Sequence, residues 1–301
     1  MKKLWSVFLS LLLVLTLGAA SAEGLLTPVD STQPVYPYTW KGNKVVRRYE
    51  TDTLKYTVET TSIQGCKCYV TKVWMKSPGQ QIKKATAEWK VNIQLPEKMA
   101  QTIEGCALAV NASGYVSPVF PWIPENYPGQ SEDYYYTPLG SLTITNGEVF
   151  RNLEGVPFYG LTLQEDGLHL HVGESNEEVL AQNPSQTWSF YVQCPMINHG
   201  EVILDETWDF AKKHAARTII AKMDANNYVL ITATSSVGLT LWDAVDFLQK
   251  KLGPEWAYDL DGGPSSALIC RRAGKKTLTV IYGGKSKDAD VMGFVELTGA
   301  E

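Results

Sequence analysis

Two aspartates, Asp259 and Asp261, are the residues whose type and spacing most directly suggest chemistry. They close a predicted strand over 256–260, and Gly262 and Gly263 follow at once. Two glycines after a carboxylate let backbone approach a ligand and point N–H groups at an anion or a sugar hydroxyl. Because alternate strand residues face the same way, the carboxylates would repel each other and the pKa of one would rise. Two alternatives remain without a chemical role. The Asp-Gly-Gly segment would be an ordinary hairpin turn, or the twist of the strand would point Asp259 to solvent.

Signatures of common cofactor and metal chemistry are missing from the sequence. It contains no G-x-x-x-x-G-K-[ST], no H-E-x-x-H and no G-x-S-x-G. His169 and His171 alternate with apolar residues, which predicts one solvent-facing side of a strand rather than metal ligands. Cys66 and Cys68 share a strand face, where small buried side chains, with or without one disulfide, are favoured over a metal site. We therefore expect no cofactor and no metal centre, although the aspartate pair is a possible cation site.

The elements around the aspartates are predicted from periodicity and turn residues. A helix over 240–252 has Thr240 as its N-cap, one apolar face and Gly253 at its end. Asn-Gly and Asp-Gly turns predict hairpins over 142–150 and 159–172. Strands dominate and helices are few, so we expect an α+β fold. Its core would be a mixed, largely antiparallel sheet with a few packed helices, in a single domain after a signal peptide.

The first 22 residues form a separate unit at the N-terminus. Lys2 and Lys3 precede an apolar run over 4–17, and Ala20 to Ala22 is a small-residue exit. These are the three parts of a secretory signal peptide, and the run is shorter than the roughly 20 residues of a membrane span. An uncleaved anchor is the alternative. No second long apolar run follows, so we expect a secreted or extracytoplasmic protein with no membrane span after cleavage.

Composition and charge narrow the function classes. The chain has 301 residues, of which 44% are hydrophobic and 20% charged, enough for a sizeable core. Its formal net charge of −5 argues against non-specific nucleic-acid binding, which needs a basic face.

We divide the chain into a signal peptide (1–22), an extended or β segment (23–95) and a domain (96–301). A Pro- and Tyr-rich loop over 117–138 either binds sugar rings or packs on the surface. The sequence leaves the oligomeric state open.

A family resemblance rests on the segment that contains the aspartates. Residues 238–266, ending in Tyr-Asp-Leu-Asp-Gly-Gly-Pro-Ser-Ser, resemble the signature of the phosphodiester glycosidase family, which includes bacterial exopolysaccharide-associated proteins. Three upstream stretches are similar to the family's motifs and come in the same order: 109–115, 194–200 and 214–218. The resemblance covers about residues 100–285.

This resemblance implies an exported hydrolase that cleaves sugar-1-phosphodiester bonds, such as those of N-acetylglucosamine, in envelope or secreted glycans. Asp261 would stabilise or attack the oxocarbenium-like centre, Asp259 would be the acid, and His199 would shuttle a proton. The planar fork of Arg217 suits phosphodiester oxygens, and Asn111 would hold sugar hydroxyls or the acetamido group. Each of these two residues also has a purely structural alternative. Arg217 would pair with an acid on the surface, and Asn111 would cap the turn that follows its strand. The other substrate-binding candidates are Gly262, Gly263, Ser265 and Thr240.

Some residues depart from the family pattern and keep two other functions open. The chain has Asp259 where the family usually has Asn and Pro264 where it usually has Gly. Residues 290–295 do not clearly match its C-terminal Arg-Val segment. The first alternative is a non-catalytic envelope protein of the same fold that binds glycan. The second is an enzyme that acts on another phosphorylated or acidic glycan. One pocket that gathers the asparagine, the arginine and Asp261 would favour an enzyme.

Overall fold

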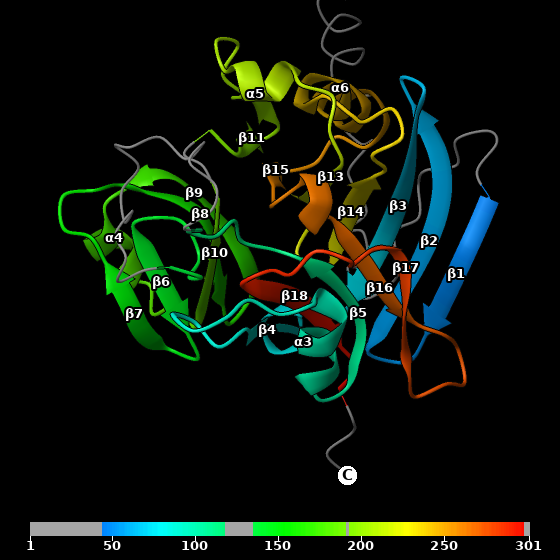
Figure 1. Ribbon diagram of the computed structural model, residues 1–301, viewed down its shortest axis with the longest axis horizontal. Coiled ribbons are helices and arrows are strands. Elements are labelled where there is room, and N and C mark those ends of the chain that lie inside the picture. Colours follow the sequence, from blue (N-terminus) through cyan, green and yellow to red (C-terminus); the bar gives the residue numbers. More distant parts are fainter. Residues whose placement is uncertain (1–43, 118–134, 191–192, 298–301) are drawn as a thin grey trace, which may run out of the picture. The chain divides into compact units, whose positions relative to one another are not determined.

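Two antiparallel β-sheets form most of the computed structural model, which describes residues 44–117, 135–190 and 193–297 (Figure 1). The larger sheet has eight strands in the order β1-β2-β3-β14-β13-β15-β11-β12. Their bounds are β1 Lys44–Glu50, β2 Leu54–Ile63, β3 Cys66–Met75, β14 Asn227–Ala233, β13 Arg217–Lys222, β15 Trp256–Asp259, β11 Pro195–Asn198 and β12 Glu201–Val202. The central strands β13 and β15 bring Arg217 and Asp259 into the same part of this sheet.

The second sheet has five strands in the order β17-β16-β5-β18-β4. Their bounds are β17 Leu278–Gly283, β16 Ala267–Arg271, β5 Cys106–Asn111, β18 Asp290–Val295 and β4 Ile82–Thr86. Two smaller sheets complete the β-structure, with the orders β10-β8-β9 and β6-β7. Their strands are β6 Leu142–Thr145, β7 Glu148–Asn152, β8 Phe158–Gln164, β9 Gly167–Glu174 and β10 Gln186–Ser189.

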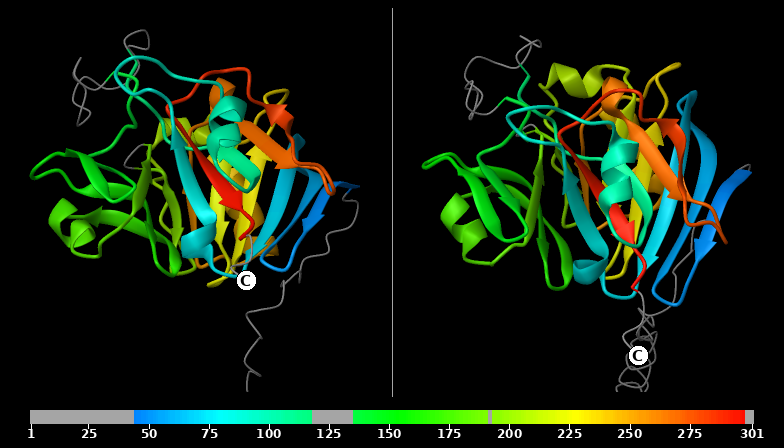
Figure 2. Two further views of the ribbon diagram at one scale, coloured as in Figure 1. Left: turned by 90° about the horizontal axis from the view of Figure 1, so that it is seen from below. Right: turned by 60° about the horizontal axis from the view of Figure 1, so that its bottom comes forward.

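Helices cover the sheets at a few places. The longest, α6 (Leu241–Lys251), packs Leu241, Ala244 and Leu248 against the larger sheet. Helix α3 (Pro96–Thr102) contacts β18 and β5 of the five-stranded sheet, as Figure 2 shows. The short helices are α2 Pro78–Gln81, α4 Asn176–Leu180, α5 Asp209–Lys212 and the 3₁₀ turn η2 Gly263–Ser265. The larger sheet is therefore covered by α6 on one face.

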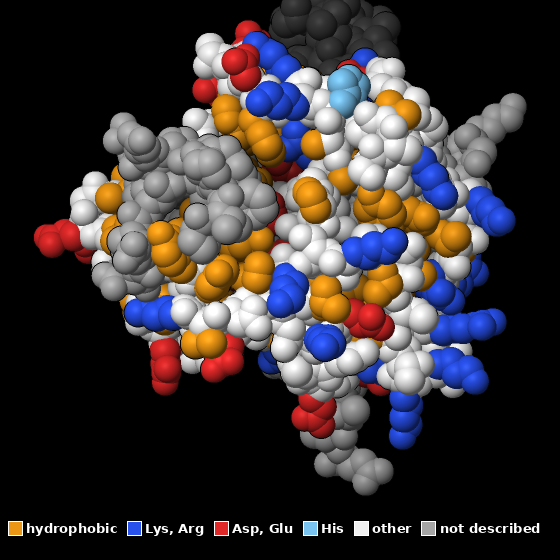
Figure 3. Space-filling model, viewed as in Figure 1, with side chains coloured by type: hydrophobic (Ala, Val, Ile, Leu, Met, Phe, Trp, Pro, Cys, Tyr) orange, Lys and Arg blue, Asp and Glu red, His pale blue; other side chains and the backbone are white. Residues whose placement is uncertain are grey.

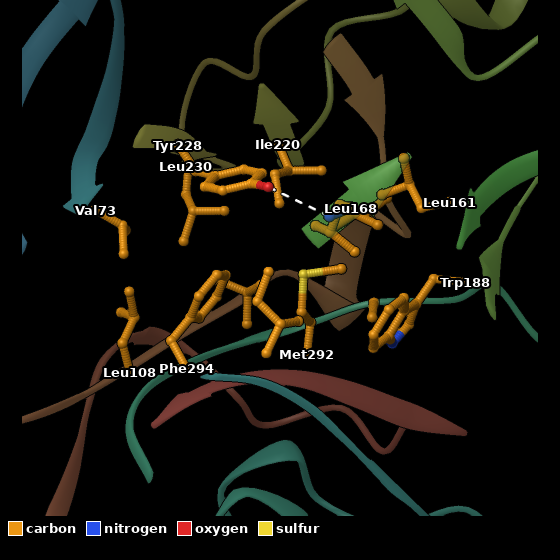
Figure 4. Close-up of a cluster of buried hydrophobic side chains, with 14 of the residues drawn as sticks. Val73, Leu108, Leu161, Leu168, Trp188, Ile220, Tyr228, Leu230, Met292 and Phe294 are labelled. Carbon is orange, nitrogen blue, oxygen red and sulfur yellow. Dashed lines mark hydrogen bonds between the residues drawn. The ribbon is translucent and has the colours of Figure 1, made fainter. Parts of the chain in front are cut away.

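The main hydrophobic core lies between the two large sheets, and strand alternation explains how it forms. In β14, Tyr228 and Leu230 join the core between the sheets, whereas Val229 and Ile231 face α6. This is the period of two expected of a strand buried on both faces. Met292 and Phe294 of β18 meet the side chains of the larger sheet (Figure 4). Trp188 and neighbouring leucines from β8 and β9 extend the core toward the three-stranded sheet, which explains why these sheets form one unit.

The sequence expectation of a largely antiparallel α+β fold with few helices is confirmed. The single mixed sheet is instead several sheets, and every pairing between described strands is antiparallel. The described part of the 23–95 segment is not separate, because β1 to β3 and β4 belong to the two large sheets. The proposed signal peptide and most of the 117–138 loop lie outside the described residues. Within the described ranges, no helix has the length and apolar character needed to cross a bilayer.

Candidate functional site

A pocket of about 390 Å³ opens where β15 ends and η2 begins. It combines aromatic and apolar walls with one carboxylate, one lysine and two serines. Its lining residues are Tyr115, Phe190, Phe210, Lys213, Ala215, Asp261, Gly262, Gly263, Pro264, Ser265 and Ser286. These come from five separate segments of the chain, which the two large sheets bring together. A concave, mostly apolar cavity with a few polar groups is typical of a small-ligand site.

Asp261 is the carboxylate of this pocket. Its backbone N–H donates to the Ala112 carbonyl at 2.8 Å, and its Oδ1 accepts from the Gly262 N–H at 2.8 Å. Burial raises the pKa of Asp261 from 3.8 to about 7, although hydrogen bonds from Ser265 and Gly262 oppose the rise, and the Asp290 charge adds to it. A carboxyl group with a pKa near neutrality can act as a base when ionised and as an acid when protonated.

Two further aspartates lie fully buried close to Asp261. Asp290 accepts from the Ser113 N–H at 2.8 Å and lies 3.1 Å from Lys84 Nζ. Asp288 accepts from the Ala289 N–H at 2.7 Å, and its Oδ2 has no hydrogen-bond partner among the described residues. Burial raises the pKa of Asp288 well above its usual range, with the charges of Asp261 and Asp290 adding to the effect. Ionisation of one of these three aspartates therefore opposes ionisation of its neighbours.

The predicted phosphate ligand, Arg217, lies beneath the pocket surface. It is fully buried, and its guanidinium donates to Asp259 Oδ2 at 3.4 Å and to the Leu239 carbonyl at 3.3 Å. Its Nη2 donates to the carbonyls of Phe210 and Lys213 at 2.8 and 3.0 Å. The guanidinium also lies over the Phe210 ring, 4.2 Å from the centroid. Arg217 thus fixes two lining residues and does not itself line the pocket; its acid partner is buried, not on the surface.

Asp259 is the buried partner of Arg217 rather than a pocket residue. Its side chain has no exposed surface, so the solvent-facing alternative is wrong. Burial raises the pKa of Asp259 to about 7; Arg217 opposes this shift and the charge of Asp261 adds to it. The expected repulsion between the two aspartates is therefore present. Asp259 Oδ1 has no hydrogen-bond partner among the described residues.

Asn111 is fully buried and links three parts of the fold. Its Nδ2 donates to the Asp261 carbonyl at 2.7 Å. Its Oδ1 accepts from Thr218 Oγ1 at 2.7 Å and from the Ala267 N–H at 2.9 Å. Asn111 therefore makes its hydrogen bonds inside the protein, where it ties the segment that carries Asp261 to β13 and β16. Asn111, Arg217 and Asp261 are brought together, but only Asp261 lines the pocket.

The two glycines after Asp261 line the pocket, but their N–H groups are already used. The Gly262 N–H donates to the Asp261 carboxylate, and the Gly263 N–H donates to the Ala216 carbonyl at 2.8 Å. The expectation that both offer donors to a ligand is therefore wrong. Glycine is needed at 262 because an added Cβ would lie 2.8 Å from the Ala216 oxygen. It is favoured at 263 by a φ of 59°.

Of the three remaining candidates, Ser265, Thr240 and His199, one lines the pocket and two lie outside its described lining. Ser265 lines the pocket and hydrogen-bonds Asp261, as expected of a site residue. Thr240 caps α6 by accepting from the Asp243 N–H at 3.0 Å, and it is not a lining residue. His199 lies exposed in the turn between β11 and β12, with a φ of 49°. Because that turn lies beside the first residues of β15, His199 is at the opposite end of the strand from Asp261, and the proton-shuttle role has no geometric support.

Seven lining residues were not among the site residues predicted from the sequence: Tyr115, Phe190, Phe210, Lys213, Ala215, Pro264 and Ser286. Tyr115 ends the 109–115 stretch, and Lys213 directly precedes the 214–218 stretch. Their position in or next to a family-like stretch could have identified both as site residues. The two phenylalanines carry no such signal, because an apolar residue outside a recognised motif is equally well explained as part of the core. Burial raises the pKa of Tyr115, and the charges of Asp288 and Asp261 add to this rise.

The cysteines and histidines show no second chemical centre in the described structure. All five cysteines are buried and free, and Cys66 and Cys68 share the core face of β3, as expected of buried apolar residues. His171 contacts Thr162 Oγ1 at 2.8 Å and Glu174 at 2.6 Å, but His171 and Thr162 are buried away from the described pocket. Among the described residues, no group of three or more His, Cys, Asp and Glu is placed to hold a metal ion.

Comparisons with known proteins concern the family and the fold of this chain. A family model described as phosphodiester glycosidase matches residues 104–295. The structure is similar to the zebrafish N-acetylglucosamine-1-phosphodiester alpha-N-acetylglucosaminidase catalytic domain auto-inhibited by its pro-peptide, with a TM-score of 0.61, 16% identity, and coverage of 85% of this chain and 88% of that one. It is also similar to a hypothetical protein from Synechocystis, with a TM-score of 0.53, 15% identity, and coverage of 85% and 64%. A search of curated proteins found no match. At these identities, the two structural likenesses show the fold alone.

Proposed function

Because this chain belongs to the phosphodiester glycosidase family, we propose that it is a hydrolase that cleaves the bond between a sugar and a phosphodiester. The observation that carries the proposal is Asp261, a carboxyl group with a pKa of about 7 in the wall of an aromatic pocket. Glycosidic cleavage needs a carboxylate beside the anomeric carbon, and Asp261 is the carboxylate among the described lining residues.

The pocket suits the two halves of such a substrate. Tyr115, Phe190 and Phe210 give the pocket an aromatic lining, and such apolar surface suits a sugar ring. Lys213 is an exposed cation in the same lining and would attract the phosphodiester charge. We therefore assign the phosphodiester contact to Lys213 instead of Arg217, because the Arg217 guanidinium is buried and hydrogen-bonds four groups inside the protein.

The reaction follows from the state of Asp261. When ionised, its carboxylate stabilises or attacks the anomeric carbon as the bond from that carbon to the phosphate oxygen breaks. The phosphate leaves with the bonding electrons as a monoester, and water supplies the new anomeric hydroxyl. The water proton passes to Asp261 or to the released phosphate. A phosphate is a good leaving group, so a separate acid need not touch the leaving oxygen. This agrees with the position of Asp259 outside the pocket.

The test is incubation with a panel of sugar-1-phosphodiesters and nucleoside-diphosphate sugars, with N-acetylglucosamine-1-phosphodiesters as the first substrates. Release of free sugar is measured for the wild type and for Asp261→Asn. We expect sugar release from at least one phosphodiester by the wild type alone. Equal release by both proteins, or release from none, would overturn the proposal.

A glycan-binding protein without turnover is the second candidate function. The observation in its favour is that Arg217 and Asn111, the two predicted polar contacts, lie below the pocket surface. The same panel decides between the functions, because a binder shows saturable binding of a phosphodiester with no sugar released.

We also propose that the chain is exported to the cell envelope or beyond. Support comes from the charged start, the apolar run over 4–17 and the small-residue exit before Glu23. Mass spectrometry of the protein from culture medium and envelope fractions tests this. We expect a mature N-terminus at Glu23, and an intact Met1 in the membrane fraction would contradict it.

A further inference from the structure

The positive charge of this acidic chain is concentrated in two short stretches. Residues 44–48 contain three Lys or Arg, and residues 267–287 contain six, whereas neither stretch contains an Asp or Glu. The whole chain has a formal net charge of −5. One third of its 27 cationic side chains therefore lies in segments that have no acid of their own.

The two stretches lie beside each other in the fold. The first is β1 at the edge of the larger sheet, and the second spans β16, β17 and the loop that follows. Arg271 Nη1 reaches the Tyr49 hydroxyl of β1 at 3.4 Å, and the Tyr56 hydroxyl donates to the Arg271 carbonyl at 2.6 Å. The space-filling view shows Lys and Arg side chains gathered on the side where β1 and the β16–β17 hairpin lie (Figure 3).

Eight of these cations have no acid partner within the described ranges, whereas Arg271 pairs with Glu296 at 3.0 Å. Seven are exposed and Arg47 is half-buried. We call these eight residues the basic face: Lys44, Arg47, Arg48, Arg272, Lys275, Lys276, Lys285 and Lys287. By contrast, Lys55, Lys72 and Lys222 elsewhere in the larger sheet each pair with a glutamate. The charge of the basic face is therefore available to a partner.

Part of the basic face adjoins the pocket. Lys285 and Lys287 flank Ser286, which lines the pocket. Gly283, the last residue of β17, pairs with Ala267, which begins β16 two residues after η2 ends. From there β17 runs as an edge strand to the turn that holds Lys275 and Lys276. Its six residues span about 20 Å at about 3.4 Å per residue.

We propose that the basic face binds a polyanionic glycan whose sugars are joined by phosphodiesters, and that it guides one end of this polymer into the pocket. The inference rests on the proposed function and extends it from a single bond to a polymeric substrate. A row of cations beside a linear polyanion gains affinity by releasing counterions. Several weak contacts along one polymer also raise its local concentration at the pocket. Because Lys285 and Lys287 adjoin the pocket, this polymer is favoured over an anionic membrane as the partner.

The test compares binding of a single N-acetylglucosamine-1-phosphodiester unit with binding of a chain of roughly eight such units. The protein carries Asp261→Asn so that nothing is cleaved. The test variant adds Lys275→Glu and Lys276→Glu in the β16–β17 turn. The control adds Lys83→Glu and Lys251→Glu, which are equally exposed but lie on the opposite edge strand β4 and on α6. Both double variants change the net charge by the same amount.

We expect the long oligomer to bind the Asp261→Asn protein more tightly than the single unit, with an affinity that falls steeply as salt rises. The turn variant should lose about tenfold in affinity for the long oligomer and keep its affinity for the single unit. The control should keep both affinities. Equal losses in the two double variants would overturn the proposal, as would affinity that does not depend on oligomer length.

Two further measurements distinguish this proposal from membrane binding and from the proposed catalytic function. Vesicles of phosphatidylglycerol and phosphatidylcholine test the membrane alternative, and vesicle binding without oligomer binding would overturn the proposal. Turnover of the single unit by proteins that retain Asp261 tests the proposed function by itself. The turn variant with Asp261 intact should hydrolyse the single unit at the wild-type rate, so a failure of the basic face and a failure of catalysis give different results.

Discussion

Arg217 Nη2 donates to the backbone carbonyls of both Phe210 and Lys213, so one residue beneath the pocket fixes an aromatic and a cationic part of its wall. The two carbonyls lie at the ends of the short helix α5, which has no side-chain cap at its N-terminus. A four-residue helix has little stability of its own. The position of this wall therefore depends on the guanidinium and on the Asp259 carboxylate that holds it.

The first prediction concerns Arg217→Lys. A lysine ammonium cannot reproduce the planar fork that reaches α5, Leu239 and Asp259 together. We expect KM for a sugar phosphodiester to rise about tenfold or more, because each lost charge-assisted hydrogen bond is worth about 1.5 kcal/mol or more. Steady-state kinetics measures this. Thermal unfolding of the same variant is the control, and a fall in kcat with unchanged KM would contradict a positioning role.

The second prediction concerns Lys213→Met. Removing the exposed cation of the pocket lining should weaken binding of anionic phosphodiesters about tenfold, and should leave a neutral aryl glycoside unaffected. Lys212→Met is the matched control, because Lys212 is an exposed neighbour outside the described lining. Isothermal titration with both ligands measures the difference. Equal losses in the two variants would show that Lys213 contributes only general charge.

The third prediction concerns Asp261→Asn. The substitution nearly preserves shape and should keep the fold, including the hydrogen bond from Asn111 to the backbone carbonyl of residue 261. Turnover should fall about 10³-fold, which is about 4 kcal/mol of transition-state stabilisation. Single-turnover kinetics checks the value, and circular dichroism checks the fold. Turnover within a few-fold of wild type would remove Asp261 from the reaction.

The sequence predicted the elements of this site better than the roles of its residues. The helix after Thr240 and the hairpin that contains Gly147 follow from local caps and turns, and both form as expected. The motif residues Asn111, Arg217 and Asp261 do gather at one place. Which of them reaches the pocket surface depends on how β5, β13 and β15 pack. A sequence pattern does not specify how deeply a side chain is buried. For this reason the sequence predicted substrate contacts for Arg217 and Asn111. In the structure both side chains donate hydrogen bonds to other groups of the protein.

The fourth prediction concerns Leu248→Ala in α6. Leu248 has no exposed surface and packs with the apolar face of the larger sheet. Truncation should lower the free energy of unfolding by about 2–5 kcal/mol, through lost apolar burial and the cavity left behind. Urea denaturation measures the loss. The exposed variant Lys251→Ala is the control, and a loss below about 1 kcal/mol for Leu248→Ala would show that this face is not core.

The fifth prediction concerns pH and the buried carboxyl group of Asp259. Folding raises its pKa from 3.8 to about 7, so the folded protein keeps this proton over a range in which the unfolded chain releases it. The stability that this gives is fully present below the lower value and is lost as pH rises toward the higher one. Asp261, whose pKa is also raised to about 7, acts in the same direction. The free energy of unfolding should therefore fall between about pH 4 and about pH 7, with at most about 1.4 kcal/mol lost per pH unit for each group.

Asp259→Asn removes one of these groups while keeping an oxygen that can accept from Arg217. The decline of stability with pH should therefore be shallower in the variant, because an amide does not ionise and only Asp261 and Asp288 remain as buried carboxyl groups with a raised pKa. Urea denaturation at closely spaced pH values measures both slopes. The surface variant Asp246→Asn is the control for the loss of one carboxylate. If Asp259→Asn and the wild type lose stability at the same rate between pH 4 and pH 7, Asp259 is already ionised in the folded protein, and its pairing with Arg217 outweighs the cost of its burial.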